Sequence, residues 1–269
     1  MILIFDTYGG LCNQMYDIQF AINYCIIYNF QFSFRYASLR LKHDLTKWND
    51  TPFNQLFNDT FIQNKLYIPF DNLDLNEENT HMYNSDLRCI EWLDKERALL
   101  PQFYRLGKEY IILRQFWAIC PQLNEIINCY EHVKPCKKLR QIFRTIKTTL
   151  PEQYNYIHYR YEEDFIQHFQ ITNHPKLCDL IQNINFNNND LNIYIAAYEI
   201  TKIKKQYLSK PINSFNNVIY KKNIPQDLNF EEYAFIDFMI GKNAKQIYGH
   251  NNSSFSVLLN AAHNSNNYY

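Results

Sequence analysis

Residues 2–14 read ILIFDTYGGLCNQ, and this stretch decides the fold. Its first four residues are apolar, as in a buried strand, and residues 6–12 contain two adjacent glycines, as a turn does. Apolar side chains then recur at helical spacing over residues 13–28, and polar and aromatic residues alternate over 31–36. Strand, turn, helix and strand form a β-α-β unit, so the sequence predicts the beginning of a parallel α/β sheet.

The same alternation begins again after Pro151. Further strands are expected over residues 108–116, 154–160, 191–196, 217–220 and 246–248. Further helices are expected over residues 86–100, 121–130, 136–149, 174–183, 199–209, 230–241 and 255–263. We therefore expect two Rossmann-like lobes, residues 1–150 and residues 151–269, whose parallel sheets face a central cleft.

The composition provides ample material for a core, since 46% of the 269 residues are hydrophobic and 17% are aromatic. Lys and Arg together number 27, and so do Asp and Glu. This balance gives no long-range attraction to nucleic acid or to an anionic membrane, so we expect neither as a partner. No apolar run approaches the roughly 20 residues that span a bilayer.

Features of the whole chain indicate the cytoplasm. The apolar run at the N-terminus is too short for the core of a signal peptide. The seven cysteines form no C-x-x-C pair, which favours reduced thiols over a disulfide framework. The richness in Asn and Ile is typical of an AT-rich genome, including that of a large virus, whose protein would act in the cytoplasm of its host cell.

Glycine is scarce, with five in the chain, and three of them lie in two turns. Gly9 and Gly10 precede the first predicted helix, and Gly249 precedes the last. Glycine is needed where the backbone takes a positive φ or comes close to another group. These turns are therefore candidates for binding a ligand.

Three segments of the sequence resemble the O-fucosyltransferase superfamily. Residues 9–14 (GGLCNQ) match its G-G-L-x-N-Q loop, residues 158–164 (HYRYEED) match its H-x-R-x-E-x-D strand end, and residues 253–256 (SSFS) match its C-terminal loop. The related α-1,2-fucosyltransferases share much of this layout. The match is thin over residues 37–150.

The resemblance implies a GT-B fold and an inverting glycosyltransferase that moves fucose from GDP-fucose to a hydroxyl of a protein or glycan acceptor. It implies no essential metal and no cofactor beyond this donor substrate. Some plant relatives use UDP-rhamnose. Many relatives carry an acidic residue eight positions after the one that matches Asp237, where this chain has Lys245. This departure keeps rhamnosyl transfer open as an alternative.

Arg160 is the first candidate for catalysis. It follows a predicted strand, and a guanidinium can neutralise the charge that grows on a departing diphosphate. His158 lies two residues earlier, so both side chains should leave the strand on one face. Glu162 and Asp164 match the acidic positions of the motif and are expected to orient Arg160. The alternative is a surface ion pair between Arg160 and one of these carboxylates.

The two turns are expected to bind the nucleotide. Gly9, Gly10 and Asn13 lie where a helix N-terminus favours anions. Ser253 and Ser254 open the last helix in the same way, and Phe255 belongs to the same motif. The alternatives are an ordinary strand-to-helix turn and an ordinary N-cap.

Two further acidic positions complete the candidate set. Asp237 lies on an otherwise apolar helix, and the resemblance places it near the nucleotide base. Asp17 in the first helix is the candidate general base, with Asp6 as a second choice. A third hypothesis is a sugar-nucleotide-binding protein that has lost catalysis, because the chain is short for this family and neither carboxylate is an obvious base.

Overall fold

The computed structural model describes residues 1–41, 44–84, 104–116, 132–172, 174–188, 192–197, 217–220 and 227–263. The expected helices over 86–100, 121–130 and 199–209 lie outside these residues. Contacts divide the chain into two units: Met1–Arg140 with Leu228–Phe235, and Gln141–Asp227 with Ile236–Tyr269. No helix in the described ranges is both long enough and apolar enough to cross a membrane.

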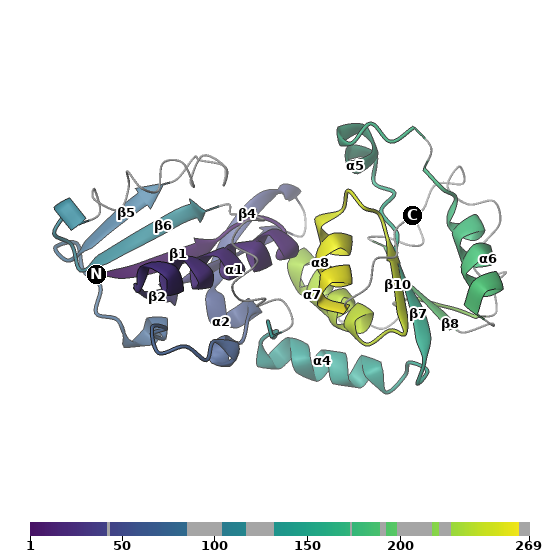
Figure 1. Ribbon diagram of the computed structural model, residues 1–269, viewed down its shortest axis with the longest axis horizontal. Coiled ribbons are helices and arrows are strands. Elements are labelled where there is room, and N and C mark those ends of the chain that lie inside the picture. Colours follow the sequence, from purple (N-terminus) through teal and green to yellow (C-terminus); the bar gives the residue numbers. More distant parts are fainter. Residues whose placement is uncertain are drawn as a thin grey trace. The chain divides into compact units, whose positions relative to one another are not determined.

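The first unit contains a parallel sheet of four strands in the order β2-β1-β6-β5. The strands are β1 (Ile2–Thr7), β2 (Gln31–Phe34), β5 (Thr80–Asn84) and β6 (Tyr110–Phe116). Helix α1 (Leu11–Tyr28) lies along β1 and β2 (Figure 1). On the sheet, a cluster of buried side chains from β1 and β6 is covered by Ile68, Phe70, Leu73 and Leu75. The β-α-β unit predicted from residues 2–36 is therefore confirmed.

The rest of the first unit was not predicted in detail. An antiparallel pair joins β3 (Tyr36–Leu41) to β4 (Asp44–Pro52). Short helices follow, namely α2 (Phe53–Leu56), η1 (Asp59–Phe61) and η2 (Phe70–Asn72). Helix α4 (Lys137–Lys147) contains the division between Arg140 and Gln141.

The second unit contains another four-stranded parallel sheet, in the order β10-β7-β8-β9. The strands are β7 (Tyr154–His158), β8 (Asn192–Ala196), β9 (Val218–Tyr220) and β10 (Gln246–Gly249). The helices in its described residues are α5 (Glu163–His168), α6 (Leu177–Asn188), α7 (Phe230–Lys242, shared with the first unit) and α8 (Ser254–His263). Two successive parallel α/β sheets are the architecture that the sequence predicted.

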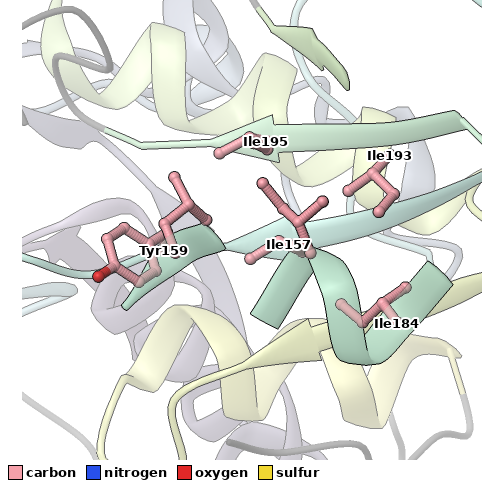
Figure 2. Packing of buried hydrophobic residues seen from close by; sticks show 7 residues of the cluster. Ile157, Tyr159, Ile184, Ile193 and Ile195 are labelled. Carbon is pink, nitrogen blue, oxygen red and sulfur yellow. The ribbon is translucent and has the colours of Figure 1, made fainter. Parts of the chain in front are cut away.

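Alternating side chains of β7 and β8 pack against helices on opposite faces of this sheet. Ile157, Ile193 and Ile195 form a core with α6 (Figure 2). On the other face Tyr154 donates a hydrogen bond from its hydroxyl to the carbonyl oxygen of Ile240 in α7 at 2.8 Å. Both faces are buried, as is usual for a parallel sheet.

Candidate functional site

Strand order reverses in both sheets. In the first sheet the chain passes from β1 to β2 on one side and later places β6 on the other. In the second it passes from β7 to β8 and β9 and later places β10 on the other side of β7. Ligands of open α/β sheets bind beyond the carboxyl ends of the strands at such a reversal. The three sequence motifs lie there: residues 9–14 follow β1, 158–164 end and follow β7, and 253–256 follow β10.

The end of β7 presents His158 and Arg160 on one face. Tyr159 between them is fully buried in the core of the second unit, whereas His158 and Arg160 are partly exposed. This alternation is the one predicted from the spacing.

Glu162 orients the guanidinium of Arg160. Arg160 donates from Nε to Oε2 of Glu162 at 2.8 Å, and the same oxygen accepts the backbone N–H of Tyr161 at 3.0 Å. The guanidinium carbon lies 4.4 Å from the ring centre of Phe165. The Arg160 side chain is 28% exposed, so a ligand can still reach it. Asp164 lies in α5, and its side chain is outside the described part of the structure.

Two histidines that the sequence analysis did not select lie near Arg160. His174 donates from Nε2 to the carbonyl oxygen of Arg160. The His250 ring stacks on that of His174, with centroids 6.2 Å apart, and meets Phe165 edge to face at 5.2 Å. Burial lowers the pKa of His250, and His174 and Arg160 lower it further. His250 follows Gly249 directly, which was the available signal; His174 lies in no recognisable pattern.

The N-terminus of α8 lies at the same edge of the second sheet as Arg160, the edge where β7 and β10 end. Ser253 caps the helix, since its carbonyl oxygen accepts the N–H of Val257 at 2.9 Å. Its hydroxyl is buried and has no hydrogen-bond partner among the described residues. Ser254 is exposed, and the Phe255 ring lies 4.3 Å from that of His158. A buried hydroxyl beside the N–H groups of a helix N-terminus is suited to an anion.

Asp237 in α7 and Lys245 just before β10 contact other parts of the second sheet. Asp237 accepts a hydrogen bond from the hydroxyl of Tyr194, in the middle of β8, at 3.3 Å. The backbone N–H of Lys245 donates to Tyr154, the first residue of β7, and its side chain is exposed. Lys245 therefore lies at the amino edge of the sheet, opposite to the edge where Arg160 follows β7.

In the first unit, Gln14 holds the glycine turn. Its Nε2 donates to the carbonyl oxygens of Gly9 at 2.8 Å and Ser38 at 2.7 Å, and its Oε1 accepts from the Thr7 hydroxyl at 2.9 Å. Gly9 has a φ of +89°, a conformation that side chains rarely allow. Its backbone lies close to Asn13, since a Cβ at Gly9 would be 3.2 Å from Nδ2 of Asn13.

Asp17 stabilises the glycine turn through a hydrogen bond to the backbone. It is 1% exposed, and its Oδ2 accepts the backbone N–H of Tyr8 at 2.9 Å. Asp6, the second candidate base, is paired with Arg35 through a short two-point contact and lies 3.6 Å from Arg114. Burial raises the pKa of Asp6, and Arg35 opposes this shift.

Arg40 is a further cation beside the glycine turn that sequence reasoning missed. A Cβ at Gly10 would lie 3.0 Å from a terminal nitrogen of Arg40. Glu231, which is fully buried, accepts the backbone N–H of Arg40 at 2.8 Å and lies 3.2 Å from its Nε. The rings of Trp48 and Phe230 lie 4.9 and 4.5 Å from the guanidinium carbon. Burial raises the pKa of Glu231, and Arg40 opposes this.

A small surface hollow lies at the reversal point of the first sheet. It is lined by Asp6, Thr7, Tyr8, Ser38, Asp50 and Arg114. Among the described residues, no group of three or more His, Cys, Asp and Glu side chains is arranged to hold a metal ion.

No protein-family model matches the chain, and no curated protein matches it in sequence. Solved structures match over nearly the whole chain. POFUT1 in complex with GDP gives a TM-score of 0.70 at 11% identity, covering 100% of this chain and 98% of that one. Fucosyltransferase NodZ from Bradyrhizobium gives 0.55 at 11% identity, covering 96% and 92%. A mutant of Arabidopsis thaliana FUT1 in complex with GDP gives 0.54 at 11% identity, covering 97% and 68%.

These matches share one architecture, which the sequence motifs also predicted. The chain therefore has the GT-B fold that these fucosyltransferase structures share.

Proposed function

We propose that this chain is a glycosyltransferase that moves fucose from GDP-fucose to a hydroxyl of a protein or glycan, with inversion at the anomeric carbon and without a metal ion. The fold supports the proposal, because POFUT1 has been solved with GDP-fucose and NodZ is described as an α-1,6-fucosyltransferase. The residues at the end of β7 and the start of α8 support it from the chemistry.

The position of Arg160 is the observation that carries the proposal. It follows β7 at the reversal point, and Glu162 holds its Nε while the guanidinium stays partly exposed. As the bond between sugar and diphosphate breaks, negative charge grows on the leaving oxygen. A preplaced guanidinium stabilises that charge, typically by about 3–4 kcal/mol.

The remaining donor contacts follow from the same chemistry. Ser253 and Ser254 offer hydroxyls and backbone N–H groups to the diphosphate, and His158 offers a ring nitrogen. In the first unit, the residues proposed to contact the sugar-nucleotide donor are Gly9, Gly10 and Asn13. Asp237 supports the nucleotide pocket through Tyr194 and β8.

We assign Asp17 to holding the glycine turn, because its carboxylate is buried and accepts the N–H of Tyr8. The acceptor hydroxyl then loses its proton to solvent or to the leaving diphosphate. This part of the proposal predicts that Asp17→Asn lowers stability together with activity.

Calorimetric titration with GDP and UDP, followed by a donor-turnover assay, tests the proposal. We expect GDP to bind and turnover of GDP-fucose to fall about 10²–10³-fold in Arg160→Ala. Arg144→Ala, an exposed position on α4, is the matched control and should behave as wild type. If UDP binds tightly and GDP does not bind, the donor substrate is UDP-rhamnose instead of GDP-fucose. GDP binding without turnover in the wild type would instead indicate a non-catalytic nucleotide-binding protein.

A further inference from the structure

His158 of the proposed site has a hydrogen-bond partner in a buried serine of α8. Its Nδ1 is 2.8 Å from the hydroxyl oxygen of Ser256 in α8. Ser256 is fully buried, and its carbonyl oxygen accepts from Nδ2 of Asn260 at 3.0 Å. The Phe255 ring at 4.3 Å limits the rotation of the imidazole from another side.

Gly249 makes this contact possible. It pairs with His158 in the register of β10 and β7. A Cβ at Gly249 would lie 2.4 Å from the hydroxyl oxygen of Ser256 and 2.5 Å from its Cβ, which no side chain can do. Three elements, β7, β10 and α8, therefore meet at one hydrogen bond that requires a glycine.

A neutral imidazole carries one proton, so a hydrogen bond at one nitrogen decides what the other offers. A hydroxyl can donate or accept, whereas the oxygens of a diphosphate accept only. If the Ser256 hydroxyl donates to Nδ1 of His158, the single proton of the neutral imidazole lies on Nε2. The ring can then donate a hydrogen bond from Nε2 to an anionic ligand.

We propose that Ser256 is a positioning residue whose hydroxyl donates to Nδ1 of His158 and so fixes the imidazole with Nε2–H as its donor to the ligand. Ser256 itself does not touch the substrate. The identity of the ligand rests on the proposed function; the tautomer does not.

Nitrogen-15 NMR of histidine-labelled protein in mildly alkaline buffer tests the tautomer without any ligand, with His158→Gln to assign the signal. We expect His158 in the wild type to be protonated at Nε2 and unprotonated at Nδ1. Ser256→Ala should give a mixture of tautomers, and Ser254→Ala, an exposed serine of the same helix, should leave the wild-type signal. A proton on Nδ1 in the wild type, or an unchanged signal in Ser256→Ala, overturns the proposal.

Titration with GDP gives the second readout. Ser256→Ala should weaken binding about tenfold, as expected for one lost hydrogen bond, while Ser256→Thr should restore most of it. Ser256→Cys keeps the size of the side chain with a weaker donor, and serves if the alanine variant does not fold. Failure of GDP to bind the wild type contradicts the proposed function alone, because the NMR result still decides the role of Ser256. Equal GDP affinity in Ser256→Ala and wild type contradicts the positioning role.

Discussion

Single residues at the end of β7 are held by neighbours of opposite charge or by aromatic rings. Arg160 lies between the carboxylate of Glu162 and the ring of Phe165, with His174 bound to its backbone. Such contacts reduce the conformational freedom that a ligand would otherwise have to restrict. The consequences of losing them can be stated for individual side chains.

Glu162→Gln should lower kcat/KM for the donor about tenfold. The amide keeps the shape of the carboxylate but gives up the charge that orients the Nε of Arg160, a charge-assisted bond partly screened by solvent. Steady-state kinetics measures the effect, and Glu152→Gln, an exposed position before β7, is the control. Wild-type kinetics in Glu162→Gln would show that Arg160 needs no orienting partner.

His250 should make stability depend on pH near neutrality. Burial and the adjacent Arg160 and His174 lower its pKa in the folded state, so between that value and the ordinary value of about 6.5 the unfolded chain binds the extra proton. The free energy of unfolding is therefore expected to be highest above pH 6.5 and to decrease as the pH falls below it.

Urea unfolding over a pH series measures this decrease, and His250→Gln should flatten it. His168→Gln, an exposed histidine of α5, should keep the wild-type slope. A slope unchanged in His250→Gln would assign the dependence to another group.

At the scale of elements, the antiparallel pair β3–β4 is joined to the first turn of α7 through Arg40 and Glu231. The two residues are far apart in sequence, and Glu231 is poorly accommodated without Arg40, because the Glu231 carboxylate is fully buried. Removing one partner of a buried pair leaves a charge in a place of low polarity.

Arg40→Met should destabilise the protein by about 3 kcal/mol, whereas Glu231→Gln should cost less because it leaves only a partly exposed cation. Urea unfolding of both variants and of the double variant gives the coupling energy. We expect the double variant to be more stable than the sum of the single effects predicts. Additive effects would show that the pair does not link these elements.

The same elements show what the sequence predicts and what it does not. Residues 2–28 and 230–241 have strong periodicity, and their strand and helices were found close to their observed bounds. The pair β3–β4 was missed because its residues 36–52 are mostly polar and have no glycine turn. Arg160 and His158 were selected because they match the H-x-R-x-E-x-D motif, and the alternation along a strand, which is a local property, predicted that they share one face. His174 and Glu231 act through tertiary contacts, for which the sequence carries no local signal.

At the scale of the molecule, the two units share one helix. Residues 230–235 of α7 group with the first unit and residues 236–242 with the second. Helix formation is cooperative, so loss of one half weakens the other. The units are therefore expected to unfold together.

Differential scanning calorimetry should show one transition with equal calorimetric and van't Hoff enthalpies. Ala234→Pro, placed just before the division, should remove a helical hydrogen bond at a cost of about 3 kcal/mol and separate the transition into two. Two transitions in the wild type would contradict the coupled unfolding of the two units. A single transition in Ala234→Pro would show that this coupling does not depend on α7.

The shared helix also bears on any attempt to obtain one half of the protein by itself. The chain enters the second unit at Gln141, leaves it after Asp227 and returns at Ile236, so truncation at one position does not release it. A gene fragment for the half that carries Arg160 would have to omit 228–235 and rejoin its neighbours with a spacer, and would begin α7 in the middle of the native helix, without its own N-cap.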